Sequence, residues 1–226
     1  MCRWLAYSGE PAPLENLIVR PQHSLIDQSM SARMAAYPTN GDGLGVGWYG
    51  RNNDPGFYHS VLPAWNDKNL QELAYHIESP LYLAHIRHST GTPVQSTNCH
   101  PFHYANWMMV HNGLIRGFEK IRRELTVAID PHYFPFMRGN TDSEMIFFLA
   151  LTFGLQKDPK SAVEKAIGLV EHHAAAVGTE NAIQMTLGFA DSEKLFGFRY
   201  STEGDSRSLF YTESPETIKK LYPDLK

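Results

Sequence analysis

Short apolar segments in the first half of the chain predict buried β-strands. Residues 81–86 form a compact apolar run after Pro80, and residues 106–110 form a second run of the same kind. Such runs are typical of strands that are buried on both faces. Shorter apolar segments at residues 4–7 and 43–49 predict two further strands.

Alternation of apolar and more polar residues predicts a hairpin nearer the end of the chain. Apolar residues recur at every second position from Ile183 to Phe189, which is the period of a strand with one polar face. Residues 191–193 predict a turn, and residues 195–200 predict the returning strand. We expect a third strand at residues 209–212.

Helical periodicity lies between these groups of strands. Residues 141–144 have the Thr-Asp-Ser-Glu pattern of a capping box and open an apolar run at 145–153. That run is apolar almost all round, so we expect a deeply packed helix. A second helix is expected at residues 159–177, after an Asp-Pro start signal, and a weaker one at 118–127. This order of elements favours an α+β fold with antiparallel sheets over a parallel, doubly wound fold.

Composition narrows the class of protein. The chain has 226 residues, of which 42% are hydrophobic and 19% are charged, as in an ordinary globular protein. The sequence has no repeat, low-complexity tract or linker, so we expect a single domain over residues 1–226. Its 20 basic and 24 acidic residues give a net charge of 20 − 24 = −4. This balance argues against a nucleic-acid partner and against a polybasic membrane anchor.

Cysteine usage and hydropathy indicate the compartment. Two cysteines without a Cys-x-x-Cys pair cannot form a disulfide framework, which fits a reducing environment. The first residues lack an apolar stretch long enough for a signal peptide, and no segment approaches the roughly 20 apolar residues of a spanning helix. We therefore expect a cytoplasmic protein that does not associate with a membrane.

A glycine-rich segment resembles a nucleotide-binding motif but favours close packing instead. Residues 45–50 match Gly-x-Gly-x-x-Gly, yet residues 51–56 predict a loop rather than the helix that a dinucleotide site requires. Alternation places four glycines on one face of a strand, where another backbone or a ligand can approach closely. These glycines are Gly41, Gly43, Gly45 and Gly47.

The eleven histidines do not have the spacing of a metal site. His85 and His88 are three residues apart in an apparent strand, so their side chains point to opposite faces. Cys99, His100 and His103 carry donor atoms, but the His-Glu-x-x-His and paired-cysteine spacings are absent. We therefore expect scattered surface and core imidazoles, no metal and no other cofactor.

Cys2 is the residue most suited to nucleophilic chemistry. Once Met1 is removed, this one residue carries both a thiol and a free α-amine. The α-amine has a pKa of about 8, so part of it is unprotonated at neutral pH and can accept the thiol proton. The alternative is a small buried hydrophobic residue at the start of a strand, and position alone does not separate the two.

Two charged residues have positions suited to recognising an α-amino acid. Arg87 follows an apolar strand, and its planar fork suits a substrate carboxylate. Asp142 lies at the start of the capped helix and suits a substrate ammonium group. The alternatives are an internal salt bridge or a surface position for Arg87, and an interaction with the helix dipole for Asp142.

The segment His111-Asn112-Gly113 closes the apolar strand at 106–110. The side-chain amide of Asn112 and the backbone N–H of Gly113 can form an oxyanion hole, in which two preorganised donors stabilise a tetrahedral oxyanion. Asn-Gly is also the strongest short signal for a type I′ hairpin turn. Taken alone, the pair favours the turn.

The order of these pieces along the chain resembles a known family. Cys2 is followed by Ile86-Arg87-His88-Ser89-Thr90-Gly91, then by His111-Asn112-Gly113, then by Asn140-Thr141-Asp142-Ser143-Glu144. This combination resembles the class-II glutamine amidotransferases, which are N-terminal-nucleophile (Ntn) hydrolases. The opening residues 1–9 and the glycine-rich block 38–50 are similar to the stand-alone, YafJ-like branch of that family.

The resemblance implies a fold and a reaction. The fold is a four-layer α/β/β/α sandwich of two antiparallel sheets. In the reaction, Cys2 attacks the γ-carboxamide carbon of glutamine and forms a γ-glutamyl thioester, which water resolves to glutamate. Asn112 and Gly113 are implied to hold the oxyanion.

The resemblance also implies the substrate-binding residues. Arg87 binds the α-carboxylate and Asp142 binds the α-amine, while Thr90 and His100 are expected at the substrate pocket. The chain departs from larger members of the family in one respect, because His88 stands where those often have tryptophan. This difference is expected to alter the cover over the pocket.

The partners implied are a small-molecule substrate and, as one alternative, a separate synthase. No synthase domain follows in this chain, so the ammonia goes to another subunit or the protein simply hydrolyses glutamine or a γ-glutamyl amide. Two other hypotheses stay open. One is a catalytically silent γ-glutamyl sensor or partner subunit that keeps Met1, and the other is an Ntn amidase that acts on a different acyl group.

Overall fold

The computed structural model describes residues 2–31, 39–50, 53–89, 91–204, 206–214, 216–217 and 220. The chain forms two compact units: the first comprises residues 1–110, 188–195 and 208–226, and the second comprises residues 111–187 and 196–207. The chain passes from one unit into the other within three strands, which are β6 (Trp107–Ile115), β7 (Ile183–Ala190) and β8 (Leu195–Ser201).

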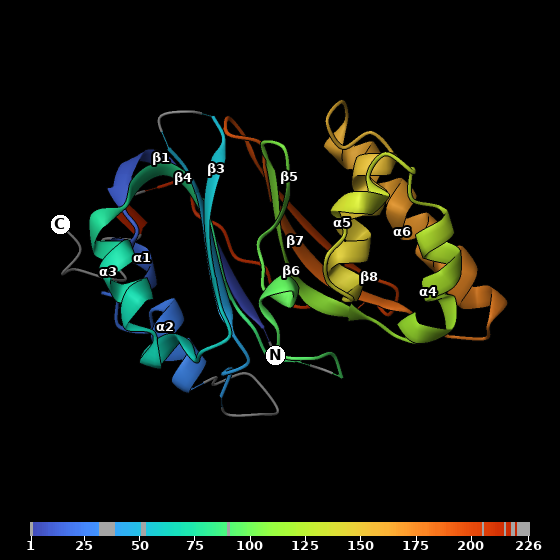
Figure 1. Cartoon of the computed structure of the whole chain (residues 1–226), viewed down its shortest axis with the longest axis horizontal. Helices are drawn as coiled ribbons and strands as arrows, with labels where there is room; N and C mark the ends of the chain where they lie inside the picture. Colours follow the sequence, from blue (N-terminus) through green and yellow to red (C-terminus); the bar gives the residue numbers. More distant parts are fainter. Residues whose placement is uncertain are drawn as a thin grey trace. The chain divides into compact units, whose positions relative to one another are not determined.

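A four-stranded antiparallel sheet forms the frame of the first unit (Figure 1). The strands in spatial order are β1 (Arg3–Pro13), β4 (Glu78–Ile86), β2 (Leu44–Tyr49) and β3 (Pro55–Ser60). Val46 in the middle of β2 pairs with Ala84 on one side and with Tyr58 on the other. The predicted strands at residues 4–7, 43–49 and 81–86 are confirmed.

The structure extends one predicted strand and adds another. β1 continues to Pro13, and an irregularity between Ser8 and Ala12 interrupts its pairing with β4. Residues 8–11 are exposed, so hydrophobic patterning carries no signal there. The sequence predicted a loop over residues 51–56, and its last two positions were wrong. β3 begins at Pro55, which pairs with Tyr49 of β2.

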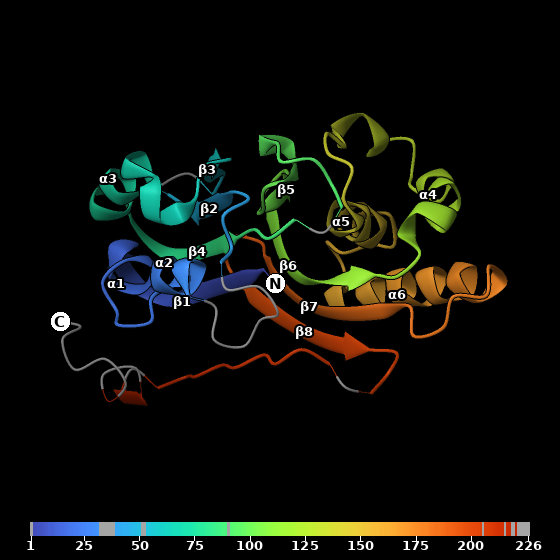
Figure 2. The same ribbon diagram turned by 90° about the horizontal axis from the view of Figure 1, so that it is seen from below.

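Short helices cover one face of this sheet (Figure 2). They are α1 (Glu15–Ile18), α2 (Leu25–Met30) and α3 (Lys68–His76). Ile18, Leu25 and Leu70 from these helices pack with Val46 and Ala84 of the sheet in one buried cluster. The three helices have four, six and nine residues, which is too short for a clear helical period in the sequence.

The opposite face of this sheet packs against the first strands of a second sheet. Leu81 and Leu83 in β4 share a buried cluster with Met108 and Val110 in β6. The short strand β5 (Phe102–Tyr104) pairs antiparallel with β6. The predicted strand at residues 106–110 is therefore confirmed.

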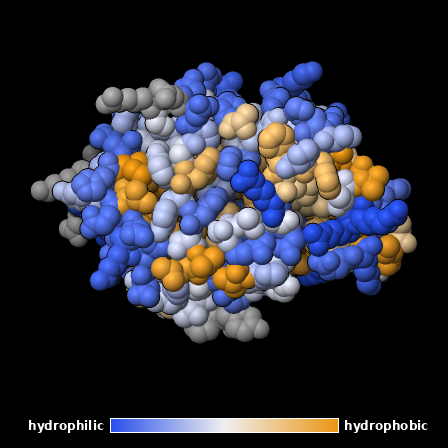
Figure 3. Space-filling model, in the orientation of Figure 1, coloured by the Kyte–Doolittle hydropathy of each residue, from blue (hydrophilic) through white to orange (hydrophobic). Residues whose placement is uncertain are grey.

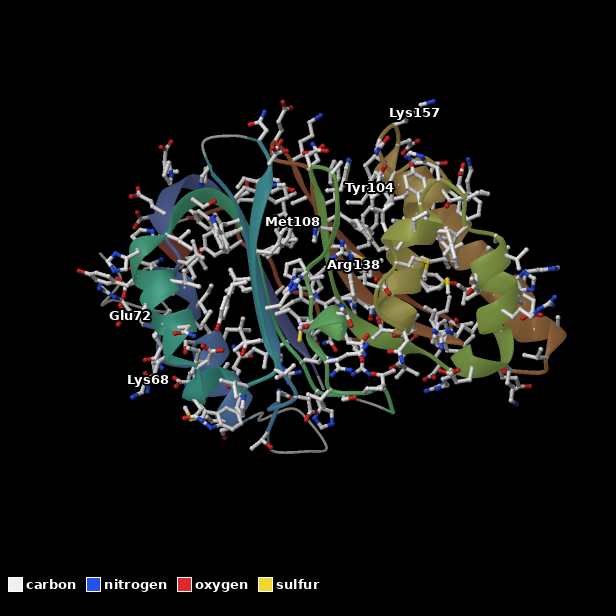
Figure 4. The ribbon with its side chains drawn as sticks, viewed as in Figure 1. Lys68, Glu72, Tyr104, Met108, Arg138 and Lys157 are labelled. Atoms are coloured by element: carbon white, nitrogen blue, oxygen red, sulfur yellow. The ribbon has the colours of Figure 1, made fainter. Side chains whose placement is uncertain are left out.

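Glycines in β2 allow this close packing. A Cβ atom on Gly45 would collide with the carbonyl oxygen of His100, and a Cβ atom on Gly47 would collide with Sδ of Met108. Figure 4 labels Met108, whose side chain points from β6 toward the first sheet. The predicted close approach of another backbone is confirmed at Gly45, and the segment after β2 leads to β3 rather than to a helix.

The second unit joins three helices to the remaining part of the second sheet, whose order is β5-β6-β7-β8. The helices are α4 (Phe118–Val127), α5 (Asp142–Thr152) and α6 (Pro159–Ala176), and the last strand is β8 (Leu195–Ser201). Tyr200 in β8 donates a hydrogen bond of 2.5 Å to Glu171 in α6, which runs beside β7 and β8 in Figure 2. All three predicted helices are confirmed, and nine consecutive residues of α5 are buried, as its uniform apolar pattern predicted.

The predicted hairpin of β7 and β8 is also confirmed, whereas the third strand at residues 209–212 is wrong. Residues 209–212 belong to no strand, and the side chains of Phe210 and Tyr211 are 85% and 86% exposed. The apolar residues of this segment are therefore not a sign of a strand, because the side chains are exposed and the backbone pairs with no sheet. Two antiparallel sheets with helices confirm the α+β class.

Among the described helices, none has both the length and the apolar character needed to cross a membrane.

Candidate active site

Cys2 lies directly before β1, and its thiol meets the segment that continues β4. Its Sγ is 3.3 Å from the backbone nitrogen of His88, which donates to it, and 3.4 Å from the carbonyl oxygen of the same residue. The side chain is half-buried. The N–H that donates to sulfur favours the thiolate, which is the nucleophilic form, whereas the bond that the thiol donates to the carbonyl favours the protonated form.

Arg87 lies at the end of β4 with only 3% of its surface exposed. Its guanidinium donates to the Asp42 carbonyl at 3.3 Å, to Ser89 Oγ at 3.3 Å and to Thr92 Oγ1 at 2.6 Å. None of these acceptors is a carboxylate, and in the described part of the chain no carboxylate forms a salt bridge with Arg87. The surface alternative for Arg87 is therefore wrong, and the described residues supply no internal salt bridge for it.

Asp42 connects the glycine-rich segment before β2 with the segment that follows Arg87. Its Oδ2 accepts a hydrogen bond of 2.8 Å from the backbone nitrogen of Ser89 and lies 3.8 Å from Nδ1 of His88. Burial lowers the pKa of His88, and the Asp42 carboxylate opposes this shift. The sequence analysis did not single out Asp42, although a charged residue between two glycines ahead of a strand was a visible signal.

Cys99 and His100 lie in the packed interior of the first unit. Burial raises the pKa of the Cys99 thiol to about 11, against the opposing charge of Arg87, so this thiol stays protonated at neutral pH. His100 is buried, and its ring contacts that of His85 in a tilted arrangement with centroids 4.0 Å apart and meets Phe102 edge-on at 4.5 Å. Thr90, the other residue expected at the pocket, lies outside the described residues.

Asn112 and Gly113 lie inside β6, which continues to Ile115. The alternative of a type I′ turn at this pair is therefore wrong. A Cβ atom on Gly113 would collide with the carbonyl oxygen of Gln184 and with Nε2 of His111, so the position has no room for a side chain. The glycine is required by the close approach of β7 rather than by a turn.

Asp142 is the first residue of α5 and ties this helix to β6. Its two carboxylate oxygens accept hydrogen bonds of 2.8 Å, one from the backbone nitrogen of Ser143 and one from that of Ile115. His111 is 2% exposed, and its Nδ1 lies 2.7 Å from Ser143 Oγ. Burial lowers the pKa of His111, and the Asp142 carboxylate opposes this shift.

The predicted cap of α5 is confirmed, with one difference. Thr141 Oγ1 accepts a hydrogen bond of 3.1 Å from the backbone nitrogen of Glu144. The Glu144 carboxylate accepts bonds of 2.8 Å from the backbone nitrogens of Arg138 and Gly139, not from that of Thr141. Figure 4 labels Arg138 in the loop before α5, and Glu144 thus holds this loop as well as the helix.

The structure gathers the predicted residues into two groups, one in each unit. Cys2 and Arg87 lie together in the first unit, through the segment 87–89. Asn112, Gly113 and Asp142 lie together in the second unit, through the hydrogen bonds between β6 and α5. Among the described residues, no group of three histidine, cysteine or carboxylate side chains is arranged to hold a metal ion.

A groove of about 750 Å³ opens in the second unit between α4, the loop before α5 and the start of α5. The lining of the groove includes Phe118, Arg122, Phe134 and Met137 but neither Asn112 nor Asp142.

On the face drawn in Figure 3, hydrophobic patches are small and are separated by hydrophilic residues.

Comparison with known proteins decides the family. The model for the glutamine amidotransferases class-II matches residues 16–215 of the chain. The chain belongs to this family. A relative in Saccharomyces cerevisiae, the probable glutamine amidotransferase DUG3, is 41% identical over 171 residues, which cover 71% of this chain and 48% of the relative.

A second curated relative extends the comparison. The γ-glutamyl-hercynylcysteine sulfoxide hydrolase of Mycolicibacterium smegmatis is 32% identical over 117 residues, which cover 51% of this chain and 52% of that protein. The chain thus spans about half the length of the curated relatives it matches.

Solved structures agree with the fold. A glutamine aminotransferase class-II domain protein from Silicibacter pomeroyi has a TM-score of 0.77 at 34% identity, covering 96% of this chain and 84% of that one. The glutamine phosphoribosylpyrophosphate amidotransferase of B. subtilis has a TM-score of 0.56 at 13% identity, covering 86% and 36%, and shows the fold alone. The Ntn-type α+β fold expected from the sequence is confirmed.

Proposed function

We propose that this class-II amidotransferase hydrolyses the γ-amide of glutamine or of another γ-glutamyl compound through a thioester on Cys2. The observation that carries the proposal is the contact between the Cys2 thiol and the segment of Arg87, a buried cation whose described acceptors are all uncharged. Family membership favours an enzyme over the catalytically silent sensor.

The substrate class follows from the charges of the two groups. A buried guanidinium without a carboxylate partner is stabilised by an incoming anion, and its planar fork matches the α-carboxylate of an amino acid. Asp142 supplies a carboxylate for the α-ammonium group. The names of two relatives support this class, because glutamine and a γ-glutamyl conjugate share the γ-glutamyl group.

The reaction needs one nucleophile, one base and an oxyanion site. After Met1 is removed, the α-amine of Cys2 accepts the thiol proton and the sulfur attacks the γ-carbonyl carbon. The side-chain amide of Asn112 and the N–H of Gly113 stabilise the oxyanion. The intermediate expels the amine, which takes the proton from the α-ammonium group, and leaves a γ-glutamyl thioester.

Water completes the cycle. The α-amine accepts a proton from the attacking water, glutamate leaves, and the thiol of Cys2 is restored. In this proposal, Thr90 and His100 help to line the substrate pocket. Transfer of the released ammonia to a separate synthase subunit is the alternative to simple release. Two free thiols, Cys2 and Cys99, fit a protein that works in the reducing cytoplasm.

Glutamate release from glutamine and a panel of γ-glutamyl amides tests this proposal. The protein is first shown by intact mass to lack Met1, and the variants Cys2→Ala and Cys99→Ala are compared with the wild type. We expect Cys2→Ala to abolish release and Cys99→Ala to retain it, because Cys99 is buried and protonated. Release that survives in Cys2→Ala would overturn the proposal.

A further inference from the structure

We propose that Asp42 is a positioning residue that holds the segment 87–89, and through it the guanidinium of Arg87 and the backbone donor for the Cys2 thiol. The inference rests on the proposed function and adds to it a residue that touches neither substrate nor the reacting atoms. It also explains how the Cys2 thiol, which precedes β1, and the Arg87 guanidinium, which follows β4, keep fixed positions in the same segment.

Asp42 contacts this segment through both its backbone and its side chain. Its backbone nitrogen donates to the carbonyl of Arg87 at 3.2 Å, and its own carbonyl accepts from Arg87 Nη1 at 3.3 Å. Its carboxylate accepts from the backbone nitrogen of Ser89 at 2.8 Å. One residue therefore holds the positions on both sides of His88, whose N–H donates to Cys2 Sγ.

The backbone that carries Asp42 is itself held in place. The next residue, Gly43, has a φ of +114°, and its carbonyl accepts from the backbone nitrogen of Arg87 at 2.8 Å. A Cβ atom there would come within 2.8 Å of Cys99 Sγ and 2.9 Å of the Ser60 carbonyl. Asp42 thus extends from a tightly packed turn, which makes it a rigid anchor rather than a mobile surface acid.

The hydrogen bond to Ser89 has a second effect on Arg87. Ser89 Oγ accepts from the guanidinium at 3.3 Å and donates to the carbonyl of Thr92 at 2.5 Å, while Thr92 Oγ1 accepts from the same guanidinium. Removal of the Asp42 side chain frees the backbone of Ser89 and loosens this arrangement. We therefore expect Arg87 to hold a carboxylate less well and the His88 N–H to stabilise the thiolate less well.

The hydrogen bond, rather than the charge on Asp42, carries most of this effect. The carboxylate is 2.8 Å from the Ser89 nitrogen but 3.8 Å from Nδ1 of His88, and burial lowers the pKa of that imidazole. An asparagine retains an oxygen that can accept from Ser89. The conservative variant should therefore rescue most of the function that alanine loses.

The test compares Asp42→Ala and Asp42→Asn with a matched control, Asp54→Asn, an exposed acid of the same unit. Two quantities are measured: the KM for the best γ-glutamyl amide, and the pH midpoint of Cys2 alkylation by iodoacetamide, mapped by peptide mass. We expect Asp42→Ala to raise the KM about tenfold, near the upper end of what a typical intramolecular hydrogen bond contributes. The alkylation midpoint should move to higher pH, and Asp42→Asn should restore most of both values.

The two readouts separate this proposal from the proposed function. Alkylation of Cys2 needs no substrate. If the wild type releases no glutamate, the pH midpoint of alkylation can therefore still be compared between the wild type and the Asp42 variants. If Asp42→Ala does not fold, Asp42→Glu displaces the carboxylate by one methylene and should move both values in the same direction. Values for Asp42→Ala equal to those of Asp54→Asn would overturn the inference.

Discussion

At the scale of single residues, the proposed roles of Arg87 and Cys2 depend on the uncharged groups that contact their side chains. A buried guanidinium surrounded by carbonyl and hydroxyl oxygens keeps its full charge available for an anionic ligand. A salt bridge would have neutralised that charge in advance. The thiol of Cys2 meets the backbone N–H and the carbonyl oxygen of His88.

Gly113 gives a prediction at the same scale. The variant Gly113→Ala places a methyl group against the Gln184 carbonyl and the His111 imidazole. We expect the strand to shift and the free energy of unfolding to fall by about 2 kcal/mol, as for overpacked sites. Urea denaturation measures this change in stability. If the Gly113 N–H stabilises the oxyanion as proposed, the same variant also has a lower kcat.

Gly168→Ala is the matched control for this prediction. Gly168 lies on an exposed position of α6 in the same unit, and a Cβ atom there meets nothing within 4 Å. Alanine should therefore stabilise the helix by up to about 1 kcal/mol. Equal stability of Gly113→Ala and the wild type would show that β6 and β7 are not so closely packed at this position.

At the scale of elements, the start of α5 combines a structural cap with a candidate substrate group. Thr141 caps the helix, Asp142 bonds to β6, Ser143 contacts His111, and Glu144 holds the preceding loop. Of these four consecutive residues, one caps the helix, two bond to β6 and one holds the preceding loop. The helix can carry a carboxylate at its first position because its neighbours hold the backbone there.

The cap can be tested by variants of Thr141. We expect Thr141→Ala to lower the free energy of unfolding by about 1 kcal/mol, because the backbone nitrogen of Glu144 loses its acceptor. Thr141→Ser keeps the hydroxyl and should keep most of the stability, which urea titration of both variants measures. A Thr141→Ser variant as unstable as Thr141→Ala would show that the methyl group of Thr141, not the cap, matters.

How far the sequence predicts an element depends on its length and on its signals. The helix α5 was predictable because it has a capping pattern and a long apolar run. The strand β3 and the helices α1, α2 and α3 were missed because they are short or are defined by pairing with neighbours. The predicted strand at 209–212 failed because local apolar character does not supply a pairing partner.

At the scale of the whole molecule, the order of motifs predicted the family, while the contacts that support the motifs were not predictable. The bond from Ser89 to Asp42 spans 47 positions of the chain, and the contact between His111 and Ser143 spans 32. Patterns of local sequence report on periodicity and turns, not on which polar groups meet across such distances. The contacts that Asp42, His111 and Ser143 make therefore follow from the fold and not from the local sequence.

The central claim is that Cys2 carries the acyl group, and its most direct test is the covalent intermediate itself. Protein without Met1 is mixed with excess γ-glutamyl amide, quenched in acid within the first turnover, and analysed by peptide mass. The account predicts one γ-glutamyl group on the Cys2 peptide, lost on treatment with hydroxylamine, and none on the Cys99 peptide. A Cys2 peptide that stays unmodified while glutamate is released would contradict it.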